Sequence, residues 1–410
     1  MPSIKDCVVL AGAELVPHRC REFGWKHDTI DRMELGHPCT QLEHGTLLVV
    51  PGLYNSHTHL GDSALPDGAA GLTLEEGFFR PHGYKYRELA KLDATTHRGH
   101  IAAAQRYMAR TGTVGHIDFR EQGVFGSKLL REASATTGVD SIILGQFNES
   151  PFAEETLAAN TATLPDSARA ELTTLLQIAD GFSESTMNDL TDTAWREIKQ
   201  ATSAAGKRRA IHCLENPGYR SLSESRTGRG DLIRAIELLE PDLIVHLTHA
   251  DANEIKLMAD SQISAVLNPQ ANTTLGLPVP PIMPLLRAGV NLLLGTDNVM
   301  LNPPNLWAEL NFTYRLARSQ AGEAQASQPD PAAILRMVTS NIAGCLGGDH
   351  HGHLAPGLPA TFAVLDFTAE HLGHTRNLMT TLVTRMGAEN VLATLRQGRE
   401  LWRHDAFDAY

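Results

Sequence analysis

Short apolar runs alternate with longer segments of helical periodicity along most of the chain, and this alternation constrains the fold more than any other feature. The clearest runs are TLLVVPG (46–52), GTVGHIDF (112–119), SIILGQF (141–147), DLIVHL (242–247), ISAVLNP (263–269) and VNLLLGTDN (290–298). Such an order indicates parallel strands joined by right-handed helical crossovers. About eight such units fit an α/β fold of the closed (α/β)8 barrel type.

Helix signals support this alternation. Residues 87–110 carry apolar side chains at mixed three- and four-residue spacing, which predicts a helix. Asp251 followed three residues later by Glu254 is typical of a helix N-terminus. Pro281 and Gly289 have the positions of a helix start and a helix end.

The two ends of the chain have a different pattern, with short strand-like runs in place of strand and helix pairs. These runs are DCVVL (6–10), TFAVLDF (361–367) and NVLATLRQGRELW (390–402). We predict that both termini form one small β-rich accessory domain beside the barrel. The expected division is 1–48 and 349–410 for the accessory domain and 49–348 for a metal-dependent hydrolase barrel.

The overall composition is that of a globular protein, with 42% hydrophobic and 20% charged residues and a net charge of −12. Nucleic acids and anionic membranes attract basic surfaces, so neither is expected as a partner. No apolar stretch approaches the ~18 residues of a membrane span, and the first residues do not resemble a signal peptide. Five scattered cysteines without a C-x-x-C pair fit a reducing compartment. We therefore expect a soluble, cytoplasmic protein.

A histidine pair follows the run 46–52, in the segment PGLYNSHTHLGD. His57 and His59 are two residues apart, so on an extended backbone their side chains point the same way. At the carboxyl end of a barrel strand, where barrel enzymes keep their active sites, they can converge on one ion. An isolated H-x-H is weak evidence in a chain with 19 histidines. His351 and His353 form another such pair.

Three further strand ends carry polar residues that suit the same site. They are His212 with Glu215, His246 with His249, and Asp297. Each taken alone is equally compatible with a hydrogen-bonded structural residue. Together, in this order, they indicate a cluster of neutral imidazoles and a carboxylate, which suits Zn²⁺ or Fe²⁺.

The sequence resembles the amidohydrolase superfamily, in the branch that holds cytosine, guanine and S-adenosylhomocysteine deaminases and the triazine chlorohydrolases. The matching segments are PGLYNSHTHLGD, IHCLE, VHLTHADANE, LNPQANTTLGLP and GVNLLLGTDN, followed by WAEL. They match in order and spacing over about residues 45–345, and the terminal segments fit the accessory domain of this family.

The resemblance implies a role for each matching residue. His57, His59, His212 and Asp297 hold one divalent ion, Zn²⁺ first and Fe²⁺ as the alternative. Glu215 shuttles protons, His246 orients the attacking water, Asp297 accepts a proton from it, and His249 supports His246. Two-metal members use a carboxylated lysine on the fourth strand. The segment LLQIADGFSES (175–185) has no lysine, which favours one metal.

Loop residues are the candidates for substrate contact. These are Glu75 and Lys85 after the first strand, Asp118, Arg120 and Glu121 after the second, and Asn272 in LNPQANTTLG, where the resemblance implies Ser-Asn in place of Ala271-Asn272. Arg120 between acidic residues equally fits a structural ion pair, and both interpretations stay open. The run 349–353, with its three histidines, is interpreted as an exposed loop and not as a metal site.

The leading hypothesis is a hydrolytic deaminase of a cyclic amidine or amino-heterocycle, such as a purine, pyrimidine or pterin. A chlorohydrolase or a cyclic amide or imine hydrolase, for instance in natural-product metabolism, is the alternative, because the same activated water serves either reaction. A catalytically inactive, ligand-binding barrel would require a lost ligand or shuttle, and Glu215, His246 and Asp297 are all present. The resemblance also implies a small heterocyclic substrate and a homodimer or larger homo-oligomer.

Overall fold

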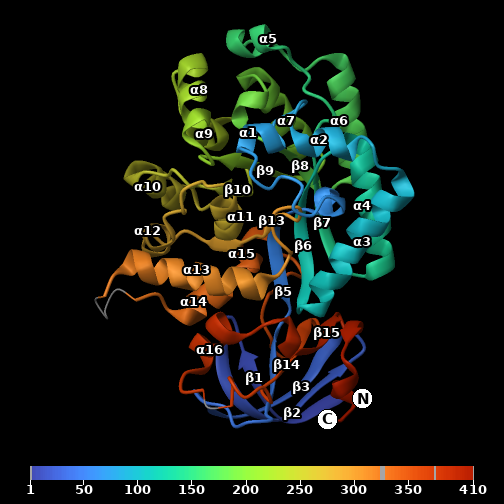
Figure 1. Cartoon of the computed structure of the whole chain (residues 1–410), viewed down its shortest axis with the longest axis vertical. Coiled ribbons are helices and arrows are strands. Elements are labelled where there is room, and N and C mark those ends of the chain that lie inside the picture. Colours follow the sequence, from blue (N-terminus) through green and yellow to red (C-terminus); the bar gives the residue numbers. More distant parts are fainter. Residues whose placement is uncertain (1, 324–327, 374, 410) are drawn as a thin grey trace.

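The computed structural model describes residues 2–323, 328–373 and 375–409, and it contains two sheets. One sheet is parallel and closes on itself, and the other combines strands from both ends of the chain. In Figure 1 the blue and red terminal strands lie side by side at the bottom, and the barrel with its helices lies above them. The predicted barrel and the accessory sheet from both termini are confirmed.

The barrel strands follow each other in chain order, and each pairs in parallel with its neighbour. They are β5 (Leu53–His59), β6 (Thr113–Arg120), β7 (Asp140–Gly145), β8 (Gly181–Glu184), β9 (Arg208–Cys213), β10 (Leu243–His246), β11 (Ser264–Leu267), β12 (Leu292–Leu294) and β13 (Asp297–Asn298). β12 pairs with β11, while β13 pairs with β5. These two segments act as one interrupted strand, so the ring closes with eight.

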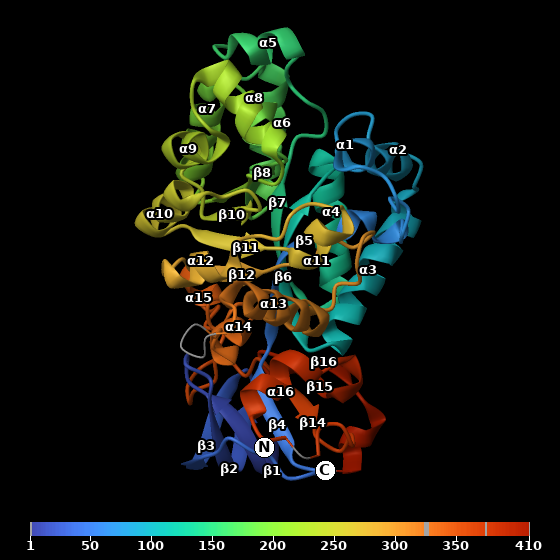
Figure 2. The same cartoon turned by 60° about the vertical axis from the view of Figure 1, so that its left-hand side comes forward.

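Helices surround the barrel, as Figures 1 and 2 show from two sides. The helices of ten or more residues are α3 (Ala94–Arg110), α4 (Gly123–Thr137), α6 (Asp166–Ile178), α7 (Asp192–Ala204), α8 (Pro217–Thr227), α10 (Ala252–Ser261) and α13 (Leu306–Ala321). Shorter ones are α1 (Leu74–Phe78), α2 (Tyr84–Leu89), α5 (Glu154–Ala159), α9 (Asp231–Arg234), α11 (Pro269–Thr274), α12 (Ile282–Arg287), α14 (Pro331–Arg336), α15 (Ile342–Leu346) and α16 (Leu378–Arg385). Single helical turns are η1 (Leu60–Ala64), η2 (Met187–Asp189), η3 (Ala235–Leu239), η5 (Ala388–Asn390) and η6 (Asp405–Ala409).

The helix signals in the sequence are correct in two of three cases. Asp251 caps α10 and forms the reciprocal capping box with Glu254. Pro281 precedes α12, and Gly289 follows its end with a φ of 77°. The single helix expected over 87–110 is wrong, because the segment is divided between α2 and α3. Asp93 begins the second helix by accepting hydrogen bonds from the first turn, which the apolar periodicity alone did not reveal.

The accessory sheet has the order β16-β15-β14-β4-β1-β2-β3. Its strands are β1 (Ser3–Ala11), β2 (Val16–Lys26), β3 (Thr29–Pro38), β4 (Leu47–Pro51), β14 (Phe362–Asp366), β15 (Val391–Arg396) and β16 (Arg399–Arg403). Phe23, Trp25 and Phe362 pack against one another in a core that belongs to this sheet. The two ends of the chain therefore share one buried apolar interior.

The chain passes from the accessory sheet to the barrel at Gly52. The run 46–52, expected to be the strand that leads to the histidine pair, is instead β4 of the accessory sheet. The histidines lie inside the next strand, β5, and not after a strand. A Cβ at Gly52 would lie 2.5 Å from Cγ1 of Val114, so only glycine fits this crossing.

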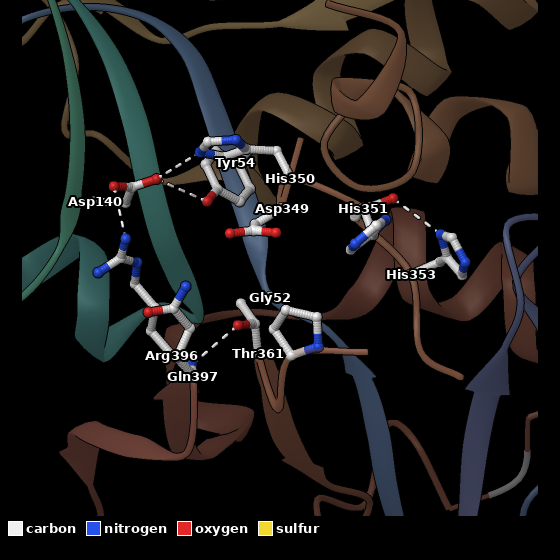
Figure 3. A pocket seen from close by; sticks show the side chains of 12 residues that line it. Gly52, Tyr54, Asp140, Asp349, His350, His351, His353, Thr361, Arg396 and Gln397 are labelled. Atoms are coloured by element: carbon white, nitrogen blue, oxygen red, sulfur yellow. Dashed lines mark hydrogen bonds and ion pairs between the residues drawn. The ribbon is translucent and has the colours of Figure 1, made fainter. Parts of the chain in front are cut away.

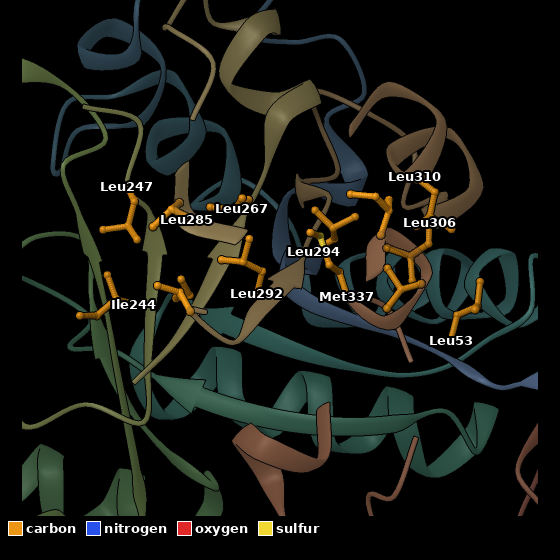
Figure 4. Close-up of a cluster of buried hydrophobic side chains, with 14 of the residues drawn as sticks. Leu53, Ile244, Leu247, Leu267, Leu285, Leu292, Leu294, Leu306, Leu310 and Met337 are labelled. Atoms are coloured by element: carbon orange, nitrogen blue, oxygen red, sulfur yellow. The ribbon is translucent and has the colours of Figure 1, made fainter. Parts of the chain in front are cut away.

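The barrel core lies between the strands and the surrounding helices. Figure 4 shows Leu267, Leu292 and Leu294 near Leu306 and Leu310 of α13. All five side chains are buried. Burying a leucine of this kind contributes ~1.5–3 kcal/mol to folding. This packing holds the strands whose carboxyl ends carry the polar cluster described next. Among the described residues, no helix combines the length and apolar character needed to cross a bilayer.

Candidate metal centre

Polar side chains from the first and last barrel strands meet where the ring closes. Nε2 of His57 lies 3.1 Å from Oδ1 of Asp297, and Nε2 of His59 lies 3.5 Å from the same oxygen. All three residues are buried. The pairing of Asp297 with Thr58 and of Asn298 with His59 sets this register. Residues 240 positions apart in the chain are thereby brought into contact.

Two further histidines join this group from β9 and β10. One ligand atom from each of His57, His212 and His246 lies within 4.8 Å of the others, and the same holds for His57, His59 and Asp297. The rings of His212 and His246 are stacked with centroids 5.3 Å apart. The four strand ends proposed from the sequence thus converge on one point.

The spacing of these atoms fits a metal ion. Ligand atoms ~2.1 Å from a tetrahedral zinc lie about 3.4 Å from one another, which is close to the 3.1 and 3.5 Å separations around Asp297. Nδ1 of His212 lies 3.0 Å from the carbonyl oxygen of Glu184. It donates its proton there, so Nε2 of His212 is left as an acceptor for a cation.

The charge states also suit a cation. Burial lowers the pKa of His57 to about 4, and burial and neighbouring imidazoles place the pKa of His212 well below its usual value. Burial alone would raise the pKa of Asp297, but the contact with His57 holds it well below the usual range. The neutral imidazoles of His57 and His212 beside an ionised carboxylate are the donors that divalent zinc or iron accepts.

The fourth strand, β8, carries Gly181, Phe182, Ser183 and Glu184 and no lysine. Glu184 forms an ion pair with Arg80. A bridging carboxylated lysine therefore has no counterpart on this strand.

Glu215 and His246 stand beside the cluster as an acid–base pair. Oε1 of Glu215 lies 3.6 Å from Nε2 of His246, and both residues are buried. Burial raises the pKa of Glu215, while the neighbouring His246 opposes that rise. A carboxyl group with a raised pKa can hold a proton and pass it on near neutral pH.

The residue that orients His246 is Asn272. Its side-chain nitrogen lies 3.1 Å from Nδ1 of His246, and the side-chain amide of Asn268 lies 3.4 Å from the same nitrogen. The supporting role expected of His249 stays a prediction, because the contacts described for this residue are those of its backbone. Its backbone nitrogen donates to Leu214 and its carbonyl accepts from Arg220. Leu247, with a φ of 54°, turns the chain away after β10.

A cavity of about 910 Å³ opens onto the cluster and is lined by His59, His212, Glu215, His246 and Asp297. Its further wall is aromatic and apolar, with Phe78, Phe79, Phe152, Tyr219, Leu275 and Leu277. Charged residues on the wall are Glu75, Arg80, Lys85, Glu154, Asp189 and Arg226. Of the loop residues proposed to contact substrate, Glu75 and Lys85 line this cavity.

The other four candidates are not among the residues that line the cavity, so their contact with substrate stays a prediction. Asp118 is buried and accepts hydrogen bonds from the Thr58 hydroxyl and the Leu60 backbone. Arg120 is buried and donates to the carbonyl oxygen of Gly126 and to Glu121. Glu121 contacts His59 and Lys85. As shown above, Asn272 binds His246. These residues satisfy buried partners and build the walls behind the site.

Sequence reasoning missed several wall residues, among them Arg80, Asp189, Tyr219 and Arg226. Arg80 pairs with Glu184 and Asp189, and Arg226 pairs with Glu154. These partners come from segments after different strands. No spacing pattern in the sequence predicts such contacts, so they become visible only in the folded barrel.

The histidine run 349–353 lies at a second, smaller pocket, shown in Figure 3. Its three histidines are half-buried, so the interpretation as a fully exposed loop is wrong. Nε2 of His350 lies 2.9 Å from Asp140, which also accepts hydrogen bonds from Tyr54 and Arg396. His350 therefore belongs to a network that joins the barrel to the accessory sheet.

The known protein families provide an independent comparison. The model of the amidohydrolase family matches residues 48–401, which is most of the chain. The chain belongs to the amidohydrolase family. The segment matched includes every strand of the barrel and every residue of the cluster described above.

Two relatives illustrate where this amidohydrolase lies among proteins of known sequence. A protein of Methanothermobacter thermautotrophicus that carries the provisional name aminohydrolase is 33% identical over 371 residues, covering 88% of this chain and 91% of the relative. A 5-methylthioadenosine/S-adenosylhomocysteine deaminase of Halobacterium salinarum is 27% identical over 367 residues, covering 87% of this chain and 81% of the relative.

Solved structures show the same fold. The adenosine deaminase of Xanthomonas campestris with bound zinc superposes with a TM-score of 0.82 at 21% identity, covering 97% of this chain and 92% of its own. The zinc complex of the atrazine chlorohydrolase of Arthrobacter aurescens gives 0.83 at 16% identity, covering 98% and 95%. The amidohydrolase is therefore an enzyme of a metal-dependent family that hydrolyses carbon–nitrogen bonds.

Proposed function

We propose that this amidohydrolase is a hydrolytic deaminase that replaces an amino group on a heterocycle by oxygen and releases ammonia. The observation that carries the proposal is the position of Glu215. Its carboxyl group lines the cavity next to His246 and Asp297, where one group can both give and take a proton.

The residues that hold the ion are His57, His59, His212 and Asp297 in this proposal, with one zinc as the preferred occupant. A bound ion of this kind lowers the pKa of a coordinated water toward ~7, so hydroxide is available near neutral pH. His246 also lies within ligand distance of His57 and His212. We assign it to orientation of the attacking water because its Nε2 faces Glu215.

The chain's own groups then move the protons. Asp297 accepts the proton of the attacking water through its carboxylate. Protonated Glu215 delivers a proton to the ring nitrogen of the substrate, then takes the proton of the new hydroxyl group and passes it to the departing amine. The proton held by Asp297 then returns Glu215 to its protonated form. His246 orients the attacking oxygen through its Nε2. One water is consumed and one ammonia is released for each amino group replaced.

The cavity suggests a substrate larger than a bare heterocyclic base. Its volume of about 910 Å³ lies near the upper end of the ~300–1,000 Å³ range of small-molecule sites. The aromatic wall suits a planar ring, and the charged pairs Arg80–Asp189 and Arg226–Glu154 suit a polar substituent. The relative named as a methylthioadenosine and S-adenosylhomocysteine deaminase supports a nucleoside-like substrate. We expect this amidohydrolase to act in the cytoplasm as a homo-oligomer.

Ammonia release from paired free bases and nucleosides tests this proposal. We expect turnover of at least one amino-heterocycle, faster for the member of the pair with the larger substituent. Release of chloride from halogenated heterocycles, or ring opening of cyclic amides, without any ammonia release would reject the deaminase assignment. That outcome would favour the chlorohydrolase or cyclic amide hydrolase alternative on the same metal centre.

A further inference from the structure

Lys85 is an unusual residue in the wall of the cavity, because its ammonium group is buried. Only 3% of its side chain is exposed. It lies on α2, in the segment between the first and second barrel strands. A buried lysine requires compensating charge, since burial of an unpaired ammonium group is costly.

Two buried carboxylates compensate the charge of Lys85. Nζ of Lys85 forms an ion pair with Oε1 of Glu121 and lies 3.8 Å from Oδ2 of Asp62. Arg120 provides Glu121 with a second cation at 3.0 Å. These four residues, which we call the Lys85 cluster, are all buried and carry two positive and two negative charges. The cluster is thus electrically balanced without any contribution from a substrate.

The first carboxylate leads from Lys85 to the candidate metal ligand on β5. Oε1 of Glu121 lies 2.7 Å from Nδ1 of His59. A carboxylate at Nδ1 keeps the proton on that nitrogen and orients the ring, so the other nitrogen is free to bind a cation. Nε2 of His59 is the atom that faces Asp297. Burial by itself would raise the pKa of Glu121, but Lys85 and His59 hold it well below its usual value.

The second carboxylate, Asp62, contacts the segment that follows Asp297 at the closure of the barrel. Oδ2 of Asp62 accepts a hydrogen bond of 2.7 Å from the side chain of Asn298. Oδ1 of Asp62 accepts another of 3.1 Å from the backbone nitrogen of Met300. Asn298 follows Asp297 directly, and Asp297 has a φ of 63°, a conformation that non-glycine residues rarely adopt. Asp62 therefore fixes the segment that must hold Asp297 in this conformation.

We infer that Lys85 is a positioning residue for the metal centre, whose ammonium group holds Glu121 against His59 and Asp62 against the segment after Asp297. This inference rests on the proposed metal site. It differs from a role in substrate binding, because it makes the affinity for the ion depend on a residue that does not touch the ion. It also links α2, which lines the substrate cavity, to both strands at the closure of the barrel.

Zinc affinity of the metal-free protein, measured by competition with a chromogenic chelator, tests the inference without any substrate. We expect Glu121→Gln and Lys85→Met each to weaken zinc binding by about 10–100-fold, the usual effect of losing a residue that orients a ligand. Lys91→Met is the matched control. Lys91 follows the same helix, is 66% exposed and pairs with Glu88 at the surface, so zinc binding should not change.

A second variant covers the case in which Lys85→Met fails to fold. Lys85→Met combined with Asp62→Asn removes one positive and one negative charge, so Glu121 keeps Arg120 and the cluster stays balanced. We expect this double variant to fold with a native circular dichroism spectrum and to bind zinc about 10–100-fold more weakly than the wild type. If Lys85 acts through Glu121, adding Glu121→Gln to Lys85→Met weakens binding by less than the product of the two single effects.

The outcomes separate this inference from the proposed function. Zinc binding by the folded Lys85 variants within twofold of the wild type would overturn the inference alone, even if Glu121→Gln binds weakly. Failure of the wild type to bind zinc would overturn the proposed metal centre and the inference with it. Weak substrate binding by Lys85→Met at unchanged zinc affinity would assign Lys85 to the substrate and would also overturn the inference.

Discussion

Histidines gather at both ends of the barrel, but their ring nitrogens are used differently. At the carboxyl end, His57 and His59 face Asp297 and the other histidines across the barrel mouth. At the amino end, His350 is engaged by Asp140 and by the carbonyl oxygen of Gly347. A metal site requires nitrogens that converge, and among the described residues the converging groups of ligand atoms lie at the carboxyl end. The number of histidines in a segment does not decide the matter.

Non-glycine residues with positive φ occur at both ends, but at the amino end Glu240 and Gln262 terminate helices, whereas at the carboxyl end such residues lie in the site itself. His246, Leu247 and Asp297 have positive φ values at the carboxyl end. Such conformations are uncommon for residues with a Cβ and collect at functional sites. Around Asp140 at the amino end, the contacts are ordinary hydrogen bonds and ion pairs between strands. The carboxyl end therefore gives up local stability for the placement of its side chains, whereas the amino end joins two sheets.

Replacing a proposed metal ligand should give the largest difference between variants of the carboxyl end and of the amino end. We expect Asp297→Asn to lose bound zinc and to lower turnover on the order of 10³-fold or more, because the charge of the site disappears. His351→Ala at the amino end should retain both the bound zinc and the turnover of the wild type. Metal content by elemental analysis, measured together with turnover, checks this pair. Equal loss of metal in both variants would show that the comparison of the two ends is misconceived.

Glu215→Gln should remove the proton shuttle while leaving the ion in place. The expected loss in kcat is about 10²–10⁴-fold, the usual contribution of a general acid–base residue. Zinc content should stay near that of the wild type, because Glu215 is not in the ligand group. Glu224→Gln, on the exposed face of α8, is the control. Retained turnover in Glu215→Gln would exclude the shuttle role.

Gly295→Ala should perturb the site through packing alone. A Cβ at this position would lie 2.5 Å from Cβ of His57 and 2.7 Å from its backbone nitrogen. We expect weaker zinc binding and a loss of about 1–3 kcal/mol in the free energy of unfolding, as for other overpacked sites. Gly99→Ala, on α3 with nothing within 4 Å, is the control and should not weaken zinc binding. Chelator competition and denaturant unfolding measure both effects.

The two ends should also respond to pH with opposite signs. Burial raises the pKa of Glu309, which contacts Gln270, to about 8. Burial alone would raise the pKa of Asp140 as well, but His350 and Arg396 lower it. A raised carboxyl pKa contributes stability that is lost as pH rises through the folded value, and a lowered one contributes stability that is lost as pH falls.

We therefore expect Glu309→Gln to reduce the decline in unfolding free energy between about pH 5 and pH 8. Asp140→Asn should instead reduce the decline below about pH 4 and destabilise the protein at neutral pH. Urea unfolding at a series of pH values checks both. A steeper decline toward pH 8 in Glu309→Gln would contradict the assignment of a raised pKa.

The parallel barrel and the residues of its metal cluster follow from local patterns in the sequence. Apolar runs predict strands, and the order of strands and helices predicts that all strands run the same way. His212, His246 and Asp297 could be assigned to one place because parallel strands bring their carboxyl ends to the same face. No detail of side-chain packing was needed for that step.

What lines the cavity was decided only by the tertiary structure. Asp118 lies near the end of β6 and Glu121 directly follows it, yet the first binds the backbone of Leu60 and the second contacts His59 and Lys85. The direction of a side chain beyond a strand end depends on turns such as that at Gln122, with a φ of 65°, and on partners far away in the chain. Periodicity describes the face of a strand or helix, and it ends where the strand or helix ends.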